Sequence, residues 1–155
     1  MDKTKNVFIS HYHKDSEHIQ KLRDLLAPKG YFIKNSSVEG KVKGQRVSDE
    51  TIRRLLRMRI QWAGTFICII SKDTHTRHWV DWEIDQANKK GKRIVGVFTE
   101  GASDSDLPSN FKNYGDTLVG WQSERIIGAI EGRINNFENP DGSPSSNKWS
   151  SRSNC

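Results

Sequence analysis

Two short segments of the chain are apolar on both of their alternating faces. They are residues 65–71 (TFICIIS) and residues 93–99 (RIVGVFT). Strands that are buried on both faces are typical of a parallel sheet covered by helices. Between them, residues 77–90 place apolar side chains, among them Val80 and Ile84, at helical spacing. This strand–helix–strand order predicts a parallel α/β unit.

The rest of the chain continues this alternation. Further strands are predicted at residues 6–10, 31–34 and 116–121, and further helices at residues 16–27, 48–63 and 124–137. The stretch from residue 100 to about 114 is predicted to be irregular. The pattern predicts an α/β, flavodoxin-like three-layer fold, a five-stranded parallel sheet in the order 2-1-3-4-5 with helices on both faces. After a domain at residues 1–137, residues 138–155 are rich in Pro, Gly, Ser and Asn and are predicted to be a disordered polar tail.

Bulk properties limit the class of protein further. The 155 residues suffice for one core, and the longest apolar stretch is far too short to span a bilayer. We recognise no secretory signal, and the two cysteines, Cys68 in an apolar run and Cys155 in the polar tail, match no disulfide or metal pattern. We therefore expect a cytoplasmic protein without membrane association. The net charge of +6, with four arginines within residues 53–59, leaves open nucleic acid, a phosphate-bearing ligand or an acidic protein partner. A solvated helix face is the commoner interpretation.

Chemically active side chains follow the first and third predicted strands. In an open parallel sheet, ligands bind beyond the carboxyl ends of the strands, at the point where the strand order reverses. For the order 2-1-3-4-5 this crevice lies above strands one and three. The residues that follow these two strands include Ser10, His11, Tyr12, His13, Trp79, Trp82 and Glu83. The turn after strand one holds neither the glycines of a phosphate-binding loop nor the acidic cluster of a phospho-receiver domain. These two common functions of the fold are therefore disfavoured.

Two motifs at these positions resemble a known family. VFISHYHKD (residues 7–15) is similar to the opening strand and turn of bacterial TIR domains. SKDTHTRHWVDWEIDQA (residues 71–87) is similar to their third strand end and following helix, in which a Trp stands four residues before a Glu, here Trp79 and Glu83. Within the family, the chain most resembles the TIR-like proteins of Thoeris anti-phage systems. It departs from the usual pattern at residues 11–13, where two histidines flank a tyrosine. This departure leaves open which contacts the pocket makes with its substrate, and hence which product forms.

The resemblance implies an NAD glycohydrolase or ADP-ribosyl cyclase. It would cleave the nicotinamide–ribose bond and make a cyclic ADP-ribose-type messenger that activates a partner effector. NAD would be the substrate, and no cofactor or metal is implied. Because nicotinamide is already a cationic leaving group, one carboxylate that stabilises an oxocarbenium-like transition state would suffice, and Glu83 is the expected catalytic residue.

The remaining expectations concern the walls of the pocket. The expected substrate-binding residues are Ser10, His11, Tyr12, His13, Ser37, Trp79 and Trp82. The loop at residues 36–47 corresponds to the family's loop that shapes the pocket and contacts a neighbouring protomer, so self-association is expected. Two alternatives stay open, which are a non-catalytic TIR adaptor and an enzyme resembling nucleoside deoxyribosyltransferases. No base-reading motif supports nucleic-acid binding.

Overall fold

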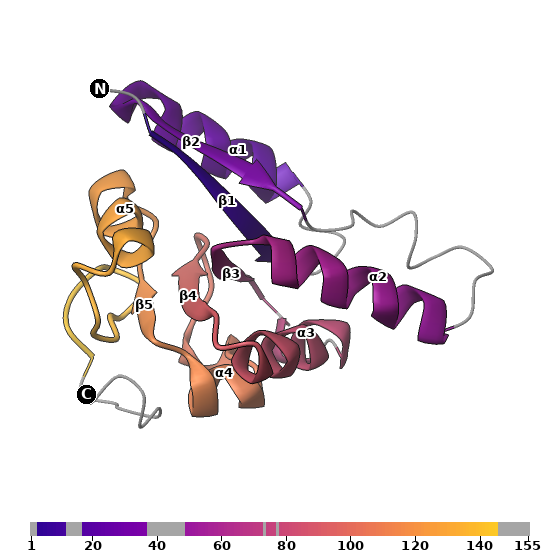
Figure 1. Cartoon of the computed structure of the whole chain (residues 1–155). Helices are drawn as coiled ribbons and strands as arrows, with labels where there is room; N and C mark the ends of the chain where they lie inside the picture. The colour runs from indigo at the N-terminus through magenta and orange to yellow at the C-terminus, as the bar shows by residue number, and fades with distance from the viewer. Residues whose placement is uncertain (1–2, 12–16, 37–48, 73, 77, 146–155) are drawn as a thin grey trace.

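The fold is a five-stranded parallel sheet with helices on both faces (Figure 1). The computed structural model describes residues 3–11, 17–36, 49–72, 74–76 and 78–145. The strands are β1 (Lys3–Ser10), β2 (Tyr31–Asn35), β3 (Thr65–Ile70), β4 (Arg93–Phe98) and β5 (Thr117–Val119). Their order is β2-β1-β3-β4-β5, and every pair is parallel. The predicted fold class is therefore confirmed.

Helices follow each of the strands. The longer ones are α1 (Glu17–Leu26), α2 (Asp49–Trp62), α3 (His78–Lys89), α4 (Ser109–Tyr114) and α5 (Ser123–Glu131), and the short 3-10 turns are η2 (Ala27–Lys29), η3 (Thr74–Thr76) and η4 (Asp104–Asp106). Residues of α2, α3 and α4 share one apolar core with one face of the sheet. Residues of α1 and α5 share a second core with the other face. The two cores make the three layers of the fold, and among the described residues no helix is long and apolar enough to cross a membrane.

Helix α4 lies in the stretch that was predicted to be irregular, so that prediction was wrong. Its buried apolar residue is Phe111, whose ring rests on β4 where Gly96 leaves space, because a Cβ at Gly96 would collide with that ring. The start of α4 is also tied to α3, since the backbone N–H of Asn110 donates to Asp81 Oδ1 at 2.8 Å. A six-residue helix held by residues distant in sequence leaves little periodic signal.

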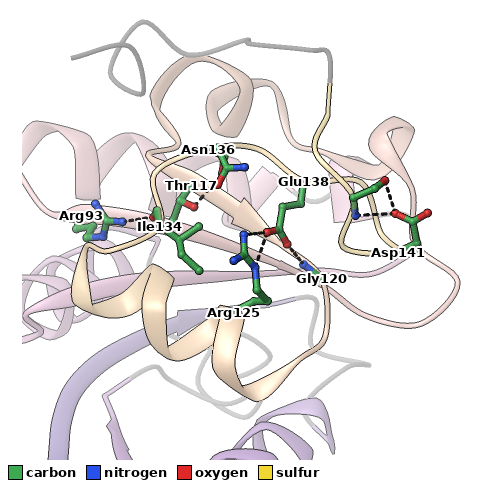
Figure 2. Close-up of polar contacts among 9 residues, drawn as sticks. Arg93, Thr117, Gly120, Arg125, Ile134, Asn136, Glu138 and Asp141 are labelled. Atoms are coloured by element: carbon green, nitrogen blue, oxygen red, sulfur yellow. Dashed lines mark hydrogen bonds and ion pairs between the residues drawn. The ribbon is translucent and has the colours of Figure 1, made fainter.

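The last helix was also predicted too long. It ends at Glu131 rather than at residue 137, because Gly132 adopts a left-handed conformation with φ of 87° that closes the helix. The guanidinium of Arg93 then binds the chain on both sides of this turn. Its Nε donates to Ala129 O at 2.7 Å. Its Nη2 donates to Ile134 O at 2.9 Å (Figure 2).

Residues beyond the predicted domain limit at 137 pack against β5. The backbone N–H of Glu138 donates to Leu118 O at 2.8 Å, and its side chain is fully buried. Glu138 Oε1 accepts from the Gly120 N–H at 3.2 Å, and Oε2 accepts from Arg125 Nε at 2.6 Å (Figure 2). The polar segment that was predicted to be disordered thus begins with a buried carboxylate that pairs with the partly exposed Arg125. Residues 146–155 lie outside the described part of the chain.

Candidate active site

The switch point of the sheet lies between β1 and β3, as predicted. The ladder between β1 and β2 ends at the pair Val7–Asn35, whereas the ladder between β1 and β3 continues to Ser10–Cys68. Beyond the last β1–β2 pair, the Ile9 N–H of β1 has no strand partner on that side among the described residues. It donates instead to Oδ1 of the Asn35 side chain at 3.0 Å. The last residues of β1 therefore stand at the rim of the sheet next to the carboxyl end of β3.

Glu83 projects from α3 onto this rim. Its Oε1 accepts a hydrogen bond of 2.6 Å from Ser10 Oγ, and both residues are 1 % exposed. Ser10 follows Phe8 by two residues and so faces the α2–α3 side of the sheet, which is the side from which Glu83 arrives. Residues 73 positions apart in sequence thus form a buried hydroxyl–carboxylate contact at the switch point.

The neighbouring thiol has an environment that makes it unreactive. Cys68 stands beside Ser10 in the sheet and is fully buried in the apolar core. Burial raises the pKa of its thiol far above the ordinary value, and the negative charges of Glu83 and Asp81 raise it further. Cys68 is thus a small buried apolar side chain, and a thiolate nucleophile is disfavoured at this place.

His11 and the turn before α3 complete the described rim. His11 is 4 % exposed, and its Nδ1 donates to Ile9 O at 3.0 Å, which assigns the proton to that nitrogen. After β3, Thr74 Oγ1 donates to Ser71 O at 2.8 Å and accepts from the Ser71 N–H at 2.8 Å. These reciprocal bonds hold the turn that leads into α3, and thereby fix the start of the helix that carries Glu83.

Trp79 and Trp82 lie on the side of α3 that meets α2. Their rings are 5.6 Å apart at 83°, and both are half-buried. The guanidinium carbon of Arg53 lies 5.7 Å from the Trp79 ring centre and 5.9 Å from that of Trp82, and Arg57 lies 5.7 Å from that of Trp82. These distances are those of cation–π contacts. From the sequence, these arginines were expected on a solvated helix face. The structure instead places them beside two predicted site residues, Trp79 and Trp82.

The structure brings together part of the predicted site. Ser10 and Glu83 are in contact, His11 adjoins Ser10 in the chain, and Trp79 precedes Glu83 by one helical turn on α3. Tyr12, His13 and Ser37 lie outside the described residues. Sequence reasoning missed Arg53 and Arg57 as neighbours of the tryptophans.

A hollow of about 430 Å³ lies between the end of β2 and α2. The described residues that line it are Lys34, Asn35, Ser36, Met58, Arg59 and Trp62, and none of the described site residues is among them. In the described part of the chain, no group of three His, Cys, Asp or Glu side chains could hold a metal ion.

These features define a doubly wound α/β domain with a buried acid at its switch point. The family model of the Thoeris protein ThsB, TIR-like domain, matches residues 8–104, which is more than half of the chain. The chain therefore belongs to this TIR-like family. No curated protein matches it.

Solved structures with a similar fold come from several sources. The chain is similar to the TIR domains of the activated Roq1 resistosome directly recognising the pathogen effector XopQ, at 20 % identity and a TM-score of 0.43 over 62 % of this chain and 58 % of that chain. It thus spans less than two thirds of that relative. It is also similar to the CMP N-glycosidase BcmB of Clostridium botulinum (17 %, 0.42, 86 % of each chain) and to a prokaryotic SEFIR domain (18 %, 0.46, 83 % and 95 %). These likenesses concern the fold and carry no information on activity.

Proposed function

We propose that this TIR-like domain cleaves the bond between nicotinamide and ribose in NAD, with Glu83 as the catalytic carboxylate. The observation that carries the proposal is the buried contact between Glu83 and Ser10 at the switch point. Burial of a carboxylate is costly, and Glu83 is buried at the switch point of the sheet, where ligands bind in this class of fold. An active site uses such a group where positive charge develops.

The reaction needs no acid to assist the leaving group. The bond from ribose C1′ to the pyridinium nitrogen breaks, and its electron pair neutralises the ring, so that nicotinamide leaves as a neutral molecule. The ribosyl centre becomes oxocarbenium-like, and the carboxylate of Glu83 stabilises its positive charge. Water then adds to C1′ and loses a proton, which gives ADP-ribose. When a nucleophile within the substrate adds instead, the product is a cyclic ADP-ribose.

The family suggests the biological setting of this reaction. We expect the product to be a cyclic ADP-ribose-type messenger that activates a partner effector in cytoplasmic anti-phage defence. Exclusion of water favours the internal nucleophile over hydrolysis, and the half-buried Trp79 and Trp82 beside the site support such a dry pocket. We also expect self-association of the domain, as in other TIR domains.

Product analysis tests the proposal. Purified protein at high concentration is incubated with NAD in water labelled with heavy oxygen, and the products are separated and weighed by mass spectrometry. Release of nicotinamide with an unlabelled cyclic product, or with labelled ADP-ribose, supports the proposal and distinguishes the two fates of the ribosyl centre. Intact NAD beside cleavage of a deoxynucleoside would favour the transferase alternative. Normal defence signalling by Glu83→Gln would favour the adaptor.

A further inference from the structure

Two arginines of α2 lie against two tryptophans of α3 next to Glu83. Arg53 and Arg57 are one helical turn apart, so both project from the same side of α2. Each guanidinium lies within 6 Å of an indole ring, and all four side chains are half-buried. Helices α2 and α3 run side by side on one face of the sheet (Figure 1). The cluster thus combines fixed positive charge with flat aromatic surfaces.

The charge of Arg53 is not neutralised within the described residues. Arg57 pairs with Glu50 at 3.5 Å, whereas Arg53 has no carboxylate and no hydrogen-bond acceptor among the described residues. Contact with an aromatic ring uses the face of a guanidinium and leaves the N–H donors along its edge. Such an arginine is preorganised, and the N–H donors along its edge can bind two oxygens of a phosphate.

The position of the cluster fits a phosphate that is joined to the reacting sugar. Trp79 precedes Glu83 by four residues on α3, so the two side chains are neighbours on the helix. In NAD, the phosphate is attached to C5′ of the same ribose whose C1′ loses nicotinamide. Donors for this phosphate must therefore lie within the reach of one sugar ring from the carboxylate. Arg53 contacts the ring of Trp79, which is one helical turn from Glu83 on α3, and is therefore a candidate for this donor.

We propose that Arg53, assisted by Arg57, binds the phosphate of the substrate and makes the Glu83 site select a nucleotide over the corresponding nucleoside. This inference rests on the proposed function, because it names the class of substrate for that site. The competing explanation is that the arginines serve only to pack α2 against α3. Packing alone would affect all substrates equally, whereas phosphate binding affects those that carry a phosphate.

The test compares three substrates with the same leaving group. NAD and nicotinamide mononucleotide carry phosphate, and nicotinamide riboside does not. We expect Arg53→Gln to lower kcat/KM for both nucleotides about 10- to 100-fold, the range for one hydrogen bond to a charged group, mainly through KM. Turnover of the riboside should stay the same, and Arg53→Lys should recover part of the loss. The matched control is Arg54→Gln, an exposed arginine on the same helix, which should behave like the wild type.

The outcomes separate this inference from the proposed function. An equal loss on all three substrates, or no loss on NAD, overturns the role of Arg53 while NAD cleavage stands. When the wild type cleaves none of the three, the proposed reaction fails, and calorimetric titration with ADP-ribose then decides the inference. Binding that is at least 10-fold weaker in Arg53→Gln than in Arg54→Gln supports a phosphate site, and equal binding overturns it.

Discussion

Removal of the arginine that pairs with Glu138 should destabilise the domain measurably. In Arg125→Met, the Glu138 carboxylate, with its side chain 1 % exposed, keeps the Gly120 N–H at 3.2 Å but loses its guanidinium partner. Leaving one charge of a buried pair without its partner costs about 3–5 kcal/mol. Because the side chain of Arg125 is itself 38 % exposed, water screens the pair and we expect the lower end, about 3 kcal/mol. For a chain of this length, that loss lowers Tm by about 6–12 °C.

Urea unfolding followed by far-UV circular dichroism measures this cost. The matched control is Lys21→Met, which removes an exposed pair with Glu17 at 3.9 Å and should cost less than about 0.5 kcal/mol. Adding Glu138→Gln to Arg125→Met removes the unpaired charge and should recover part of the loss. A free energy of unfolding in Arg125→Met that equals that of the control would show that the pair between Arg125 and Glu138 does not stabilise the folded domain.

Two further predictions concern the site and the dependence of stability on pH. Ser10→Ala removes the hydroxyl that donates to Glu83, so kcat for NAD should fall about 10- to 100-fold with little change in KM. Ser10→Thr keeps a hydroxyl and should keep more activity. An unchanged kcat of Ser10→Ala in steady-state kinetics would contradict this role of Ser10. Burial, and then the charge of Glu131, raise the pKa of Tyr31 to about 12 from its ordinary 10.0, although Arg133 acts in the opposite direction. The folded state therefore holds this proton more tightly, so the free energy of unfolding should decline as pH rises from about 10 to 12. Urea titrations across this range should show a smaller decline in Tyr31→Phe, and an equal decline would exclude Tyr31 as a source.

The sheet could be predicted because its central strands carry their signal locally. β3 and β4 are apolar on both faces, which indicates a buried parallel sheet before any contact is known. The position of Glu83 followed from a motif at fixed spacing and from the rule that ligands bind at the switch point. The hydrogen bond between Glu83 and Ser10 requires that β1 and β3 be neighbours in the sheet. The alternation of strands and helices already indicated this strand order.

Features that depend on distant residues escaped prediction. Helix α4 rests on the space above Gly96 and on Asp81, neither of which is in its own segment. Apolar Ile134 and Phe137 continued the apolar pattern of α5 past the glycine that ends the helix. The surface of α2 that bears Arg53 was predicted to be solvated from the sequence. Helical periodicity shows which side of a helix is polar, but it does not show that a neighbouring helix places aromatic rings against that side.

The rate of nicotinamide release by Glu83→Gln shows whether the Glu83 carboxylate is the catalytic group. Glutamine keeps the size of the side chain and can still accept from Ser10, but it removes the charge that the ribosyl centre requires. The control is Glu124→Gln on α5, whose side chain is 82 % exposed. With both variants folded, as judged by circular dichroism, we expect a rate at least about 100-fold below wild type for Glu83→Gln and an unchanged rate for Glu124→Gln. Equal rates in the wild type and Glu83→Gln would contradict this role of Glu83.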